Sequence, residues 1–390
     1  MNFSAGNYLG DRIRWLAVLI VLCFVSVLLV RSQSAASYPT YFIALIMLFS
    51  IRSWVDVFRS RFVQLILALL IWLSLSVFWS ENLVLREAIS IWTRAVLVFC
   101  FVVALAECQL RGEVQHWLRL GLTGVGVAVV LVSIVNFYIT NPEDGRLNGL
   151  GQLDTHVIAA LIYGVVGLFT LQYVLQTDSV IGRVAGALIL LVVMFAIFLS
   201  DSRNAWVSTL LGLGTLGLTY LVKDSRQFLA YTITFTFLLG AALGLLLLSD
   251  DARAFLLPRG LSFRPEIWSA TLERITQSSW LFGAGILTPD GVKLGDLLFD
   301  HPHNLYLALL FQGGLVALGL FLALVCIAVG CGLKRYESAD GKLVLAIFAL
   351  GLSAFLLDGH HLVDKVGEAW FLFWLPIGIA LGMNMQKPVA

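Results

Sequence analysis

Three arginines stand out because each lies in a polar segment between long apolar stretches of a 390-residue chain. Arg146 follows the fifth apolar stretch, Arg203 lies in the break at 200–203, and Arg264 lies in the longest polar segment. A guanidinium group keeps its charge and offers a planar pair of donors to phosphate oxygens. Three such groups brought together near a membrane surface would suit a diphosphate headgroup.

A histidine block precedes the tenth apolar stretch and consists of Asp300, His301, Pro302, His303 and Asn304. A histidine that is neutral near pH 7 can accept the proton of a hydroxyl group. Together with the arginines, this block predicts a site at which an alcohol displaces a phosphate leaving group.

Each block also has a structural interpretation when it is taken alone. Arg203 can pair with Asp201 or anchor a helix at the membrane edge. Arg264 can cap its helix through Glu266, and Asn304 suits a helix N-cap. The functional interpretation gains weight because all four blocks lie on one predicted face of the membrane.

The histidines could instead bind a metal. His301, His303, His360 and His361 are plausible ligands of zinc or manganese. Their spacing matches no strong metal signature, and adjacent histidines chelate a single ion poorly. The five cysteines lie inside or at the ends of apolar stretches and suggest neither disulfides nor a cysteine metal site. We therefore predict no metal and no cofactor.

The composition determines the class of protein. Hydrophobic residues make up 59% of the chain and charged residues 13%, whereas a soluble domain is near half apolar and a quarter charged. An aqueous globular enzyme is therefore excluded. The net charge is +1, and the charged residues are scattered over short loops. Both features argue against a nucleic-acid partner.

The apolar stretches approach the length that a helix needs to cross a bilayer, where backbone groups must be bonded within their own segment. We predict an all-α, polytopic membrane protein in which residues 1–390 form a single integral membrane domain. The twelve predicted membrane helices are 14–30, 38–51, 62–79, 88–106, 117–140, 156–176, 180–199, 204–222, 228–249, 304–331, 342–357 and 367–384.

The orientation follows from the basic residues of the short loops. If the N-terminus is cytoplasmic, fourteen Lys and Arg, among them Arg52 and Lys387, lie in the cytoplasmic loops, and five lie in the opposite ones. Both termini are therefore predicted to be cytoplasmic. The three arginines and the histidine block then lie on the extracytoplasmic side.

The loop at 250–303 is the longest and begins with Asp250 and Asp251. Apolar residues recur in it at helical spacing from Trp268 to Trp280, and Pro265 suits a first helical turn. This pattern predicts an amphipathic helix in the membrane interface, either packed on the bundle or acting as a lid.

These blocks and their order resemble the O-antigen ligase family, within the superfamily of O-antigen ligases, polymerases and bacterial protein O-oligosaccharyltransferases. The resemblance covers about residues 140–335. It rests on Gly145-Arg146-Leu147-Asn148-Gly149, on Ser202-Arg203-Asn204-Ala205-Trp206, on Arg264-Pro265-Glu266-Ile267-Trp268 with Gly283-Ala284-Gly285, and on His303-Asn304-Leu305-Tyr306-Leu307 with Gly313-Gly314-Leu315.

The resemblance implies a glycosyltransferase with about a dozen membrane helices, a GT-C-like architecture, a large periplasmic loop and no metal requirement. Such an enzyme of the bacterial inner membrane transfers glycan from undecaprenyl diphosphate to a hydroxyl of lipid A-core on the periplasmic side and completes lipopolysaccharide. Arg203 and Arg264 match arginines that hold the diphosphate, with Arg146 as a third contact. His303 matches the histidine that activates the acceptor, supported by His301 and Asn304. Attack from the face opposite the diphosphate would invert the sugar carbon.

Two departures from the superfamily pattern bear on the branch. Gln312 stands where a Glu is frequent, and Asp154-Thr155-His156 replaces a common Pro-Asn. The alternatives are an O-antigen polymerase, which uses a second lipid-linked glycan as acceptor, and a protein O-oligosaccharyltransferase. A membrane transporter or flippase is the more distant alternative, although no repeat between two halves is evident.

Overall fold

The computed structural model describes residues 5–48, 54–246 and 263–386. Arg52, Lys387 and the end of the second predicted membrane helix at 49–51 lie outside the described residues. The end of the ninth, at 247–249, and the first part of the long loop, with Asp250 and Asp251, also lie outside them.

The described residues are mostly helical, with a single two-stranded antiparallel sheet among them. The elements in chain order are α1 (Ala5–Leu29), α2 (Gln33–Ala36), α3 (Tyr38–Leu48), α4 (Trp54–Arg59), α5 (Arg61–Leu75), the 3₁₀ turn η2 (Ser76–Trp79), α6 (Leu85–Gln109), α7 (Gly112–Thr140), α8 (His156–Gln176), α9 (Val180–Leu199), α10 (Arg203–Leu221), α11 (Ser225–Leu246), α13 (Arg264–Gln277), β1 (Val292–Leu294), β2 (Leu297–Phe299), α14 (Leu305–Lys334), α15 (Ala339–Ala354), the π-helical turn η3 (Trp370–Trp374) and α16 (Leu375–Met385).

A helix overlaps each of the twelve predicted segments. Several helices begin earlier than predicted. Among them, α6 starts at Leu85 and α7 at Gly112, and the helix dipole stabilises Glu87 and Glu113 in their first turns. Among the described residues, seven helical segments are long and apolar enough to cross a membrane. They are Asp11–Leu29, Arg61–Trp79, Leu85–Gln109, Gly112–Thr140, His156–Gln176, Val180–Leu199 and Leu305–Lys334. These helices indicate a multi-pass membrane protein.

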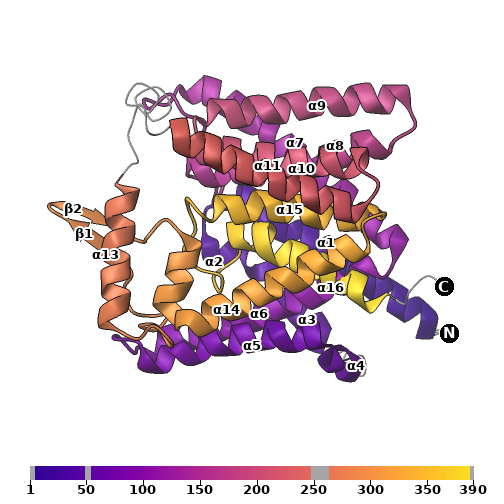
Figure 1. Ribbon diagram of the computed structural model, residues 1–390. Helices are drawn as coiled ribbons and strands as arrows, with labels where there is room; N and C mark the ends of the chain where they lie inside the picture. Colours follow the sequence, from indigo (N-terminus) through magenta and orange to yellow (C-terminus); the bar gives the residue numbers. More distant parts are fainter. Residues whose placement is uncertain (1–4, 49–53, 247–262, 387–390) are drawn as a thin grey trace.

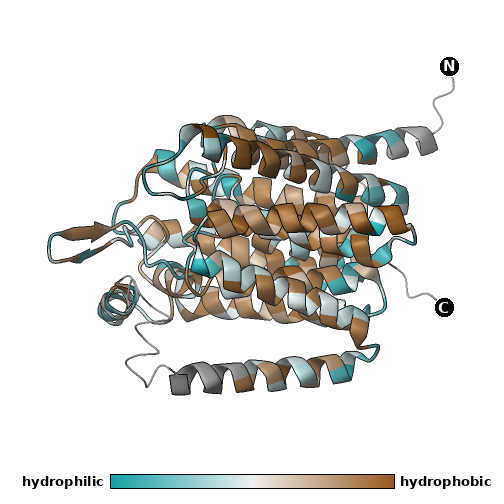
Figure 2. Ribbon diagram, turned by 90° about the horizontal axis from the view of Figure 1, so that it is seen from above, coloured by the Kyte–Doolittle hydropathy of each residue, from teal (hydrophilic) through white to brown (hydrophobic). Residues whose placement is uncertain are grey.

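The long helices lie side by side, and α13 with the β1–β2 hairpin lies at one end of the bundle (Figure 1). The start of α1 and the end of α16 lie near the opposite end, and α13 runs across the direction of the bundle helices (Figure 1). Hydrophobic residues dominate the middle of the bundle, and hydrophilic residues gather toward the helix ends and connections (Figure 2). A bilayer requires this distribution of polarity.

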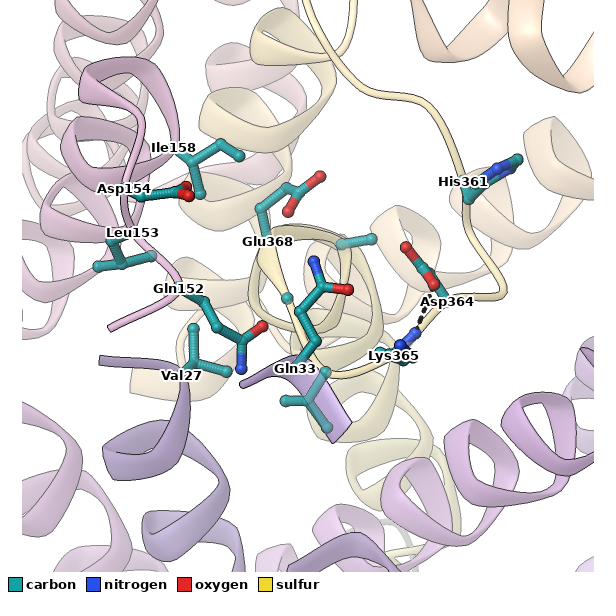
Figure 3. Close-up of a pocket in the computed structure, with 13 residues that line it drawn as sticks. Val27, Gln33, Gln152, Leu153, Asp154, Ile158, His361, Asp364, Lys365 and Glu368 are labelled. Carbon is teal, nitrogen blue, oxygen red and sulfur yellow. Dashed lines mark hydrogen bonds between the residues drawn. The ribbon is translucent and has the colours of Figure 1, made fainter. Parts of the chain in front are cut away.

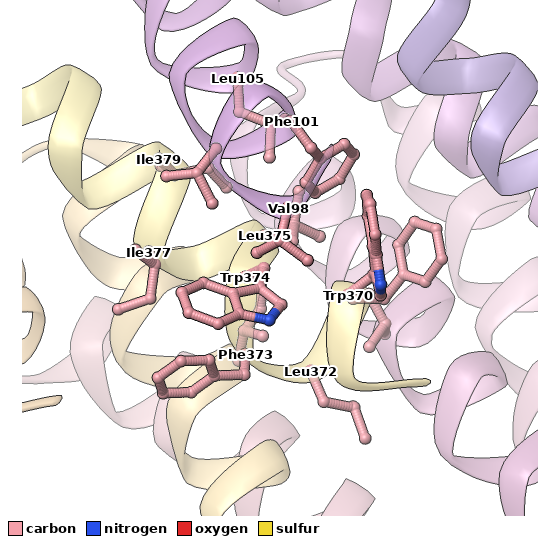
Figure 4. Close-up of a cluster of buried hydrophobic side chains, with 14 of the residues drawn as sticks. Val98, Phe101, Leu105, Trp370, Leu372, Phe373, Trp374, Leu375, Ile377 and Ile379 are labelled. Atoms are coloured by element: carbon pink, nitrogen blue, oxygen red, sulfur yellow. The ribbon is translucent and has the colours of Figure 1, made fainter. Parts of the chain in front are cut away.

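A buried aromatic cluster joins α6 to η3 and α16 (Figure 4). The ring of Phe101 lies 4.9 Å from that of Trp370. The indole N–H of Trp370 donates to the Asp364 carbonyl (3.1 Å), and that of Trp374 donates to the Leu362 carbonyl (2.9 Å). The cluster therefore fixes the loop between α15 and η3, which carries residues 358–366.

Helix α14 is interrupted near its start, where Gly314 has φ of 67° and ψ of −165°. The segment after α13 supplies the missing hydrogen bonds: Ala284 N–H donates to the Phe311 carbonyl (2.6 Å) and Gly285 N–H to the Gln312 carbonyl (3.0 Å). The two glycine motifs of the sequence are thus packed against each other. A Cβ atom at position 314 would overlap the Leu281 backbone, which explains the glycine.

The predicted helix of the long loop is confirmed as α13, with Pro265 in its first turn. Arg274 on this helix donates to the carbonyls of Gly291 (2.8 Å) and Pro289 (2.6 Å). In the hairpin that follows, Val292 pairs with Phe299. Helix α13 therefore holds the turn that carries Asp290 against the end of the bundle.

Candidate active site

Arg146 lies in the segment between α7 and α8 and reaches two other elements. Its Nη1 lies 3.2 Å from Nε2 of His156, the first residue of α8. Its Nε lies 3.7 Å from a carboxylate oxygen of Asp201, in the break between α9 and α10. The neighbouring Leu147 N–H donates to the Leu199 carbonyl (2.9 Å), which attaches the segment to the end of α9.

The break predicted at 200–203 is confirmed and places Arg203 at the first position of α10. Asp201 has a φ of 49°, and the Ser202 hydroxyl accepts from Ala205 N–H (3.3 Å) as the N-cap. Arg203 is close enough to Arg264 for their charges to repel each other. The structure thus brings two of the predicted arginines together from positions 61 residues apart.

Arg264 is the first residue of α13, and its Nε donates to the Leu357 carbonyl (3.1 Å), just after the end of α15. Burial and the charge of Arg203 lower the pKa of Arg264, while the Asp358 carboxylate acts in the opposite direction. The like charges of Arg203 and Arg264 at a partly buried site are an electrostatic cost that a bound dianion would relieve.

The starts of α10 and α14 are tied to the last residue of α15 and to the residues that follow it. Asn204 donates to the Ala354 carbonyl (3.2 Å), and Asn304 donates to the Leu356 carbonyl (3.0 Å). The Asn304 amide oxygen also accepts from Leu307 N–H (3.0 Å). The structural interpretation of Asn304 as an N-cap is therefore confirmed.

His303 contacts a carboxylate that comes from a distant part of the chain. Its Nδ1 lies 3.3 Å from Oδ1 of Asp358. His303 also has a φ of 49°, a left-handed backbone that is uncommon for residues other than glycine. Its backbone N–H donates to Nδ1 of His301 (3.1 Å). Strained backbone of this kind is found preferentially at functional sites.

Asp358 remains ionised in this environment. Burial would raise the pKa of its carboxyl group, but the hydrogen bond with His303 and the one from Gly359 N–H (2.9 Å) outweigh burial and hold that pKa below its usual range. His301 responds in the opposite way: burial and the charges of His303 and His360 lower its pKa to about 4. His301 is therefore neutral at pH 7.

A second polar network lies beside the first and involves His360 and His361. Nε2 of His360 lies 3.0 Å from Oδ1 of Asp290. The buried amide of Gln312 lies 2.9 Å from Nδ1 of His361 and donates to the His360 carbonyl (3.2 Å). Burial would raise the pKa of Asp290, but the bond with His360 and the charges of both histidines lower it.

The atoms of His301, His303 and Asp358 that could act as ligands all lie within 4.8 Å of one another, so these three residues could hold a metal ion. Imidazole and carboxylate groups are usual ligands of zinc and manganese. His360 and His361 bond to Asp290 and Gln312 instead. Of the four histidines that the sequence offered as metal ligands, the structure places His301 and His303 where they could bind an ion together with Asp358.

Asp358 is the functional candidate that the sequence interpretation did not single out. It belongs to the block Asp358-Gly359-His360-His361, which was considered only for its histidines. Asp358 interacts with His303 directly and electrostatically with Arg264 and His156. An acidic residue beside histidines on the predicted extracytoplasmic face was the available signal.

Comparison with known proteins identifies similar sequences. The O-antigen ligase family matches residues 186–322, a range that contains Arg203, Arg264, His301 and His303. An O-antigen ligase from Pseudomonas aeruginosa is 29% identical over 297 residues, which cover 76% of this chain and 70% of that protein. The resemblance predicted from the sequence motifs is confirmed.

Proposed function

We propose that the protein is an O-antigen ligase of the bacterial inner membrane, because its residues 186–322 match the O-antigen ligase family. It transfers a glycan from undecaprenyl diphosphate to a hydroxyl of lipid A-core on the periplasmic side. The observation that carries the proposal is the convergence of Arg203, Arg264, His303 and Asp358 at one end of the helical bundle.

The arginines act on the donor. Arg203 and Arg264 bind the diphosphate. Arg146, whose side chain contacts Asp201 and His156, is a third contact of the diphosphate. As the bond between the sugar carbon and the diphosphate oxygen breaks, negative charge grows on that oxygen. Guanidinium groups placed there in advance stabilise the transition state, and removal of one such donor typically costs about 100- to 1000-fold in rate.

His303 acts on the acceptor. The contact between Nδ1 and the Asp358 carboxylate favours the tautomer that carries its proton on Nδ1, so Nε2 is the proton acceptor. Nε2 takes the proton of the acceptor hydroxyl while the hydroxyl oxygen bonds to the sugar carbon. The products are the glycosylated core and undecaprenyl diphosphate, with the sugar carbon inverted. The chemistry requires neither a metal nor a cofactor.

The membrane arrangement belongs to the same proposal. We infer twelve membrane helices in a GT-C-like architecture, cytoplasmic termini and a periplasmic segment at 250–303. The position of α13 and the hairpin at the end of the bundle away from the start of α1 and the end of α16 supports this arrangement (Figure 1). The His303 block at the start of α14 and Arg203 at the start of α10 would then face the periplasm.

The product of the reaction tests the proposal. Purified protein in detergent is mixed with undecaprenyl-diphosphate glycan and lipid A-core, and the products are separated by gel electrophoresis. Glycan on the core is expected. Longer lipid-linked chains formed from donor alone would instead identify a polymerase, and no transfer of any kind would favour a transporter.

A further inference from the structure

A partly enclosed polar cavity of about 100 Å³ lies between the end of α1, the start of α2, the segment before α8 and the loop before η3 (Figure 3). We call it the amide cavity. Its polar lining includes the amides of Gln33 and Gln152 and the carboxyl groups of Asp154 and Glu368. In Figure 3 the Gln33 side chain extends between Gln152 and Glu368.

Gln152 is held in place by its backbone. Its N–H donates to the Val27 carbonyl (3.1 Å) at the end of α1. The preceding Gly151 has a φ of 63°, and a Cβ at that position would lie 2.7 Å from the Leu29 nitrogen. Only glycine allows the segment to approach α1 this closely. The direction of the Gln152 side chain is therefore set by packing of the main chain.

The side-chain nitrogen of Gln152 is buried and has no hydrogen-bond partner among the residues that the structure describes. A buried amide N–H normally finds an acceptor in the protein, in water or in a ligand. The cavity has room for about three water molecules. Hydroxyl groups of a ligand could replace such waters and accept from Gln152.

The amide cavity adjoins a second cavity whose lining includes Asp358, the partner of His303. A smaller cavity of about 60 Å³ is lined by His301 and Asp358, and it shares Ile158 and Glu368 with the amide cavity as common walls. Asp358 in turn contacts His303. A ring seated at Glu368 would therefore lie next to the cavity that contains Asp358, the residue that contacts Nδ1 of His303.

The chemistry of the lining selects the type of ligand. Amides both donate and accept, and the oxygens of carboxyl groups accept, which together suit the hydroxyl groups of a sugar. Of the described residues that line the amide cavity, Lys365 is the cation and none is an arginine. The lining therefore suits a sugar better than the diphosphate. The diphosphate would be bound by the arginines of the active site, among them Arg146 and Arg264.

We propose that the amide cavity binds the hydroxyl-bearing edge of the acceptor sugar and positions it for attack. The inference rests on the proposed function and deepens it. The first sugar of the donor offers the same hydroxyl chemistry, and the experiment separates the two sources.

The test compares Gln152→Leu with wild type and with Gln227→Leu, an exposed glutamine of α11 outside the cavity. Binding of core oligosaccharide freed of lipid A, and separately of undecaprenyl-diphosphate glycan, is measured by calorimetry. Transfer kinetics are measured with each substrate varied, and melting temperatures verify folding. Asp154→Asn serves as a second variant because Asp154 is exposed and asparagine has nearly the same size, so the replacement should leave packing unchanged.

For Gln152→Leu we expect the Kd and KM for the core to rise about tenfold, the effect of one lost net hydrogen bond. The donor values and the control variant should stay within about twofold of wild type. A rise for the donor alone would overturn the acceptor assignment. Wild-type values for both substrates in both cavity variants would overturn the site.

The two proposals fail in different ways. If wild type transfers glycan to core but the affinity for core does not depend on Gln152, the cavity proposal fails and the proposed function stands. If wild type transfers nothing but binds core in a Gln152-dependent manner, the proposed function fails and the sugar site stands.

Discussion

Nδ1 of His303 lies 3.3 Å from Oδ1 of Asp358, although 55 residues separate the two in the chain. His303 precedes α14 and Asp358 follows α15, so the packing of these two helices creates the pair. The carboxylate orients the imidazole and stabilises the imidazolium that would form during proton transfer. Asp358 is therefore a positioning residue for the proposed base.

Replacement of Asp358 tests this pairing. Asp358→Asn should lower kcat by about 100-fold, within the range that general-base catalysis supplies. KM for either substrate should change little because Asp358 is not proposed to contact them. Asp178→Asn, at an exposed site before α9, is the matched control and should behave as wild type. Wild-type kcat in Asp358→Asn would exclude the positioning role.

Binding of the diphosphate should depend on the planar shape of the guanidinium groups as well as on their charge. Arg203→Lys and Arg264→Lys keep a positive charge but lose the planar fork, so each should reduce kcat/KM for the donor by about 10- to 100-fold. The double variant should lose less than the product of the single losses, because the two residues bind one group. Arg183→Lys, on an exposed arginine near the start of α9, supplies the control. Full activity in both single variants would contradict the diphosphate site.

The stability of the protein should depend on His301 at acidic pH. The pKa of His301 is about 4 in the folded protein, below its value of about 6.5 in an unfolded chain. The unfolded state therefore binds the proton more readily, and stability falls as the pH drops from about 6.5 to about 4. The apparent melting temperature of His301→Asn should decline less than that of wild type over this range.

The control for this pH dependence is His116→Asn, since His116 is exposed near the start of α7. Its melting curve should follow that of wild type at each pH. If the melting temperatures of His301→Asn and wild type decline in parallel, protonation of His301 does not contribute to acid destabilisation.

The break in α14 provides a test of the fold. Gly314→Ala places a side chain at φ of 67° and against the Leu281 backbone, so it should destabilise the protein by more than the roughly 1–3 kcal/mol of backbone strain alone. Gly319→Ala in the same helix meets nothing within 4 Å and should be neutral or stabilising by up to about 1 kcal/mol. Equal melting temperatures for the two variants would contradict the described packing.

Removal of metal ions with a chelator tests whether the transfer reaction needs a metal. His301, His303 and Asp358 could hold an ion, but the proposed mechanism leaves Nε2 of His303 available to a hydroxyl. Transfer should therefore proceed at the same rate after dialysis against EDTA. Added zinc should inhibit by occupying these ligands. Loss of activity in EDTA that zinc or manganese restores would replace the general-base mechanism by a metal-assisted one.

The sequence predicted those features that depend on local pattern. Apolar length located the helices, Pro265 marked the start of α13, and the polar break before Asn204 separated α9 from α10. The glycines at 283 and 314 were noted as motifs, but their mutual packing depends on the interruption of α14 and could not be derived from spacing.

The contacts of the site could not be predicted because they are made between distant segments. His303 meets Asp358, and Gln312 meets His361, only after α14 and α15 pack together. Gln312 appeared in the sequence as a departure from a glutamate. In the structure its amide donates to the His360 carbonyl (3.2 Å), a bond that an ionised glutamate could not make.

The role of His303 is the central claim, and the most direct test is single-turnover transfer from undecaprenyl-diphosphate glycan to lipid A-core. Wild type, His303→Ala and His116→Ala are compared at equal, verified folding. We predict glycan on the core with wild type and His116→Ala, and a rate lower by about 100- to 10,000-fold with His303→Ala. A wild-type rate in folded His303→Ala would contradict the account.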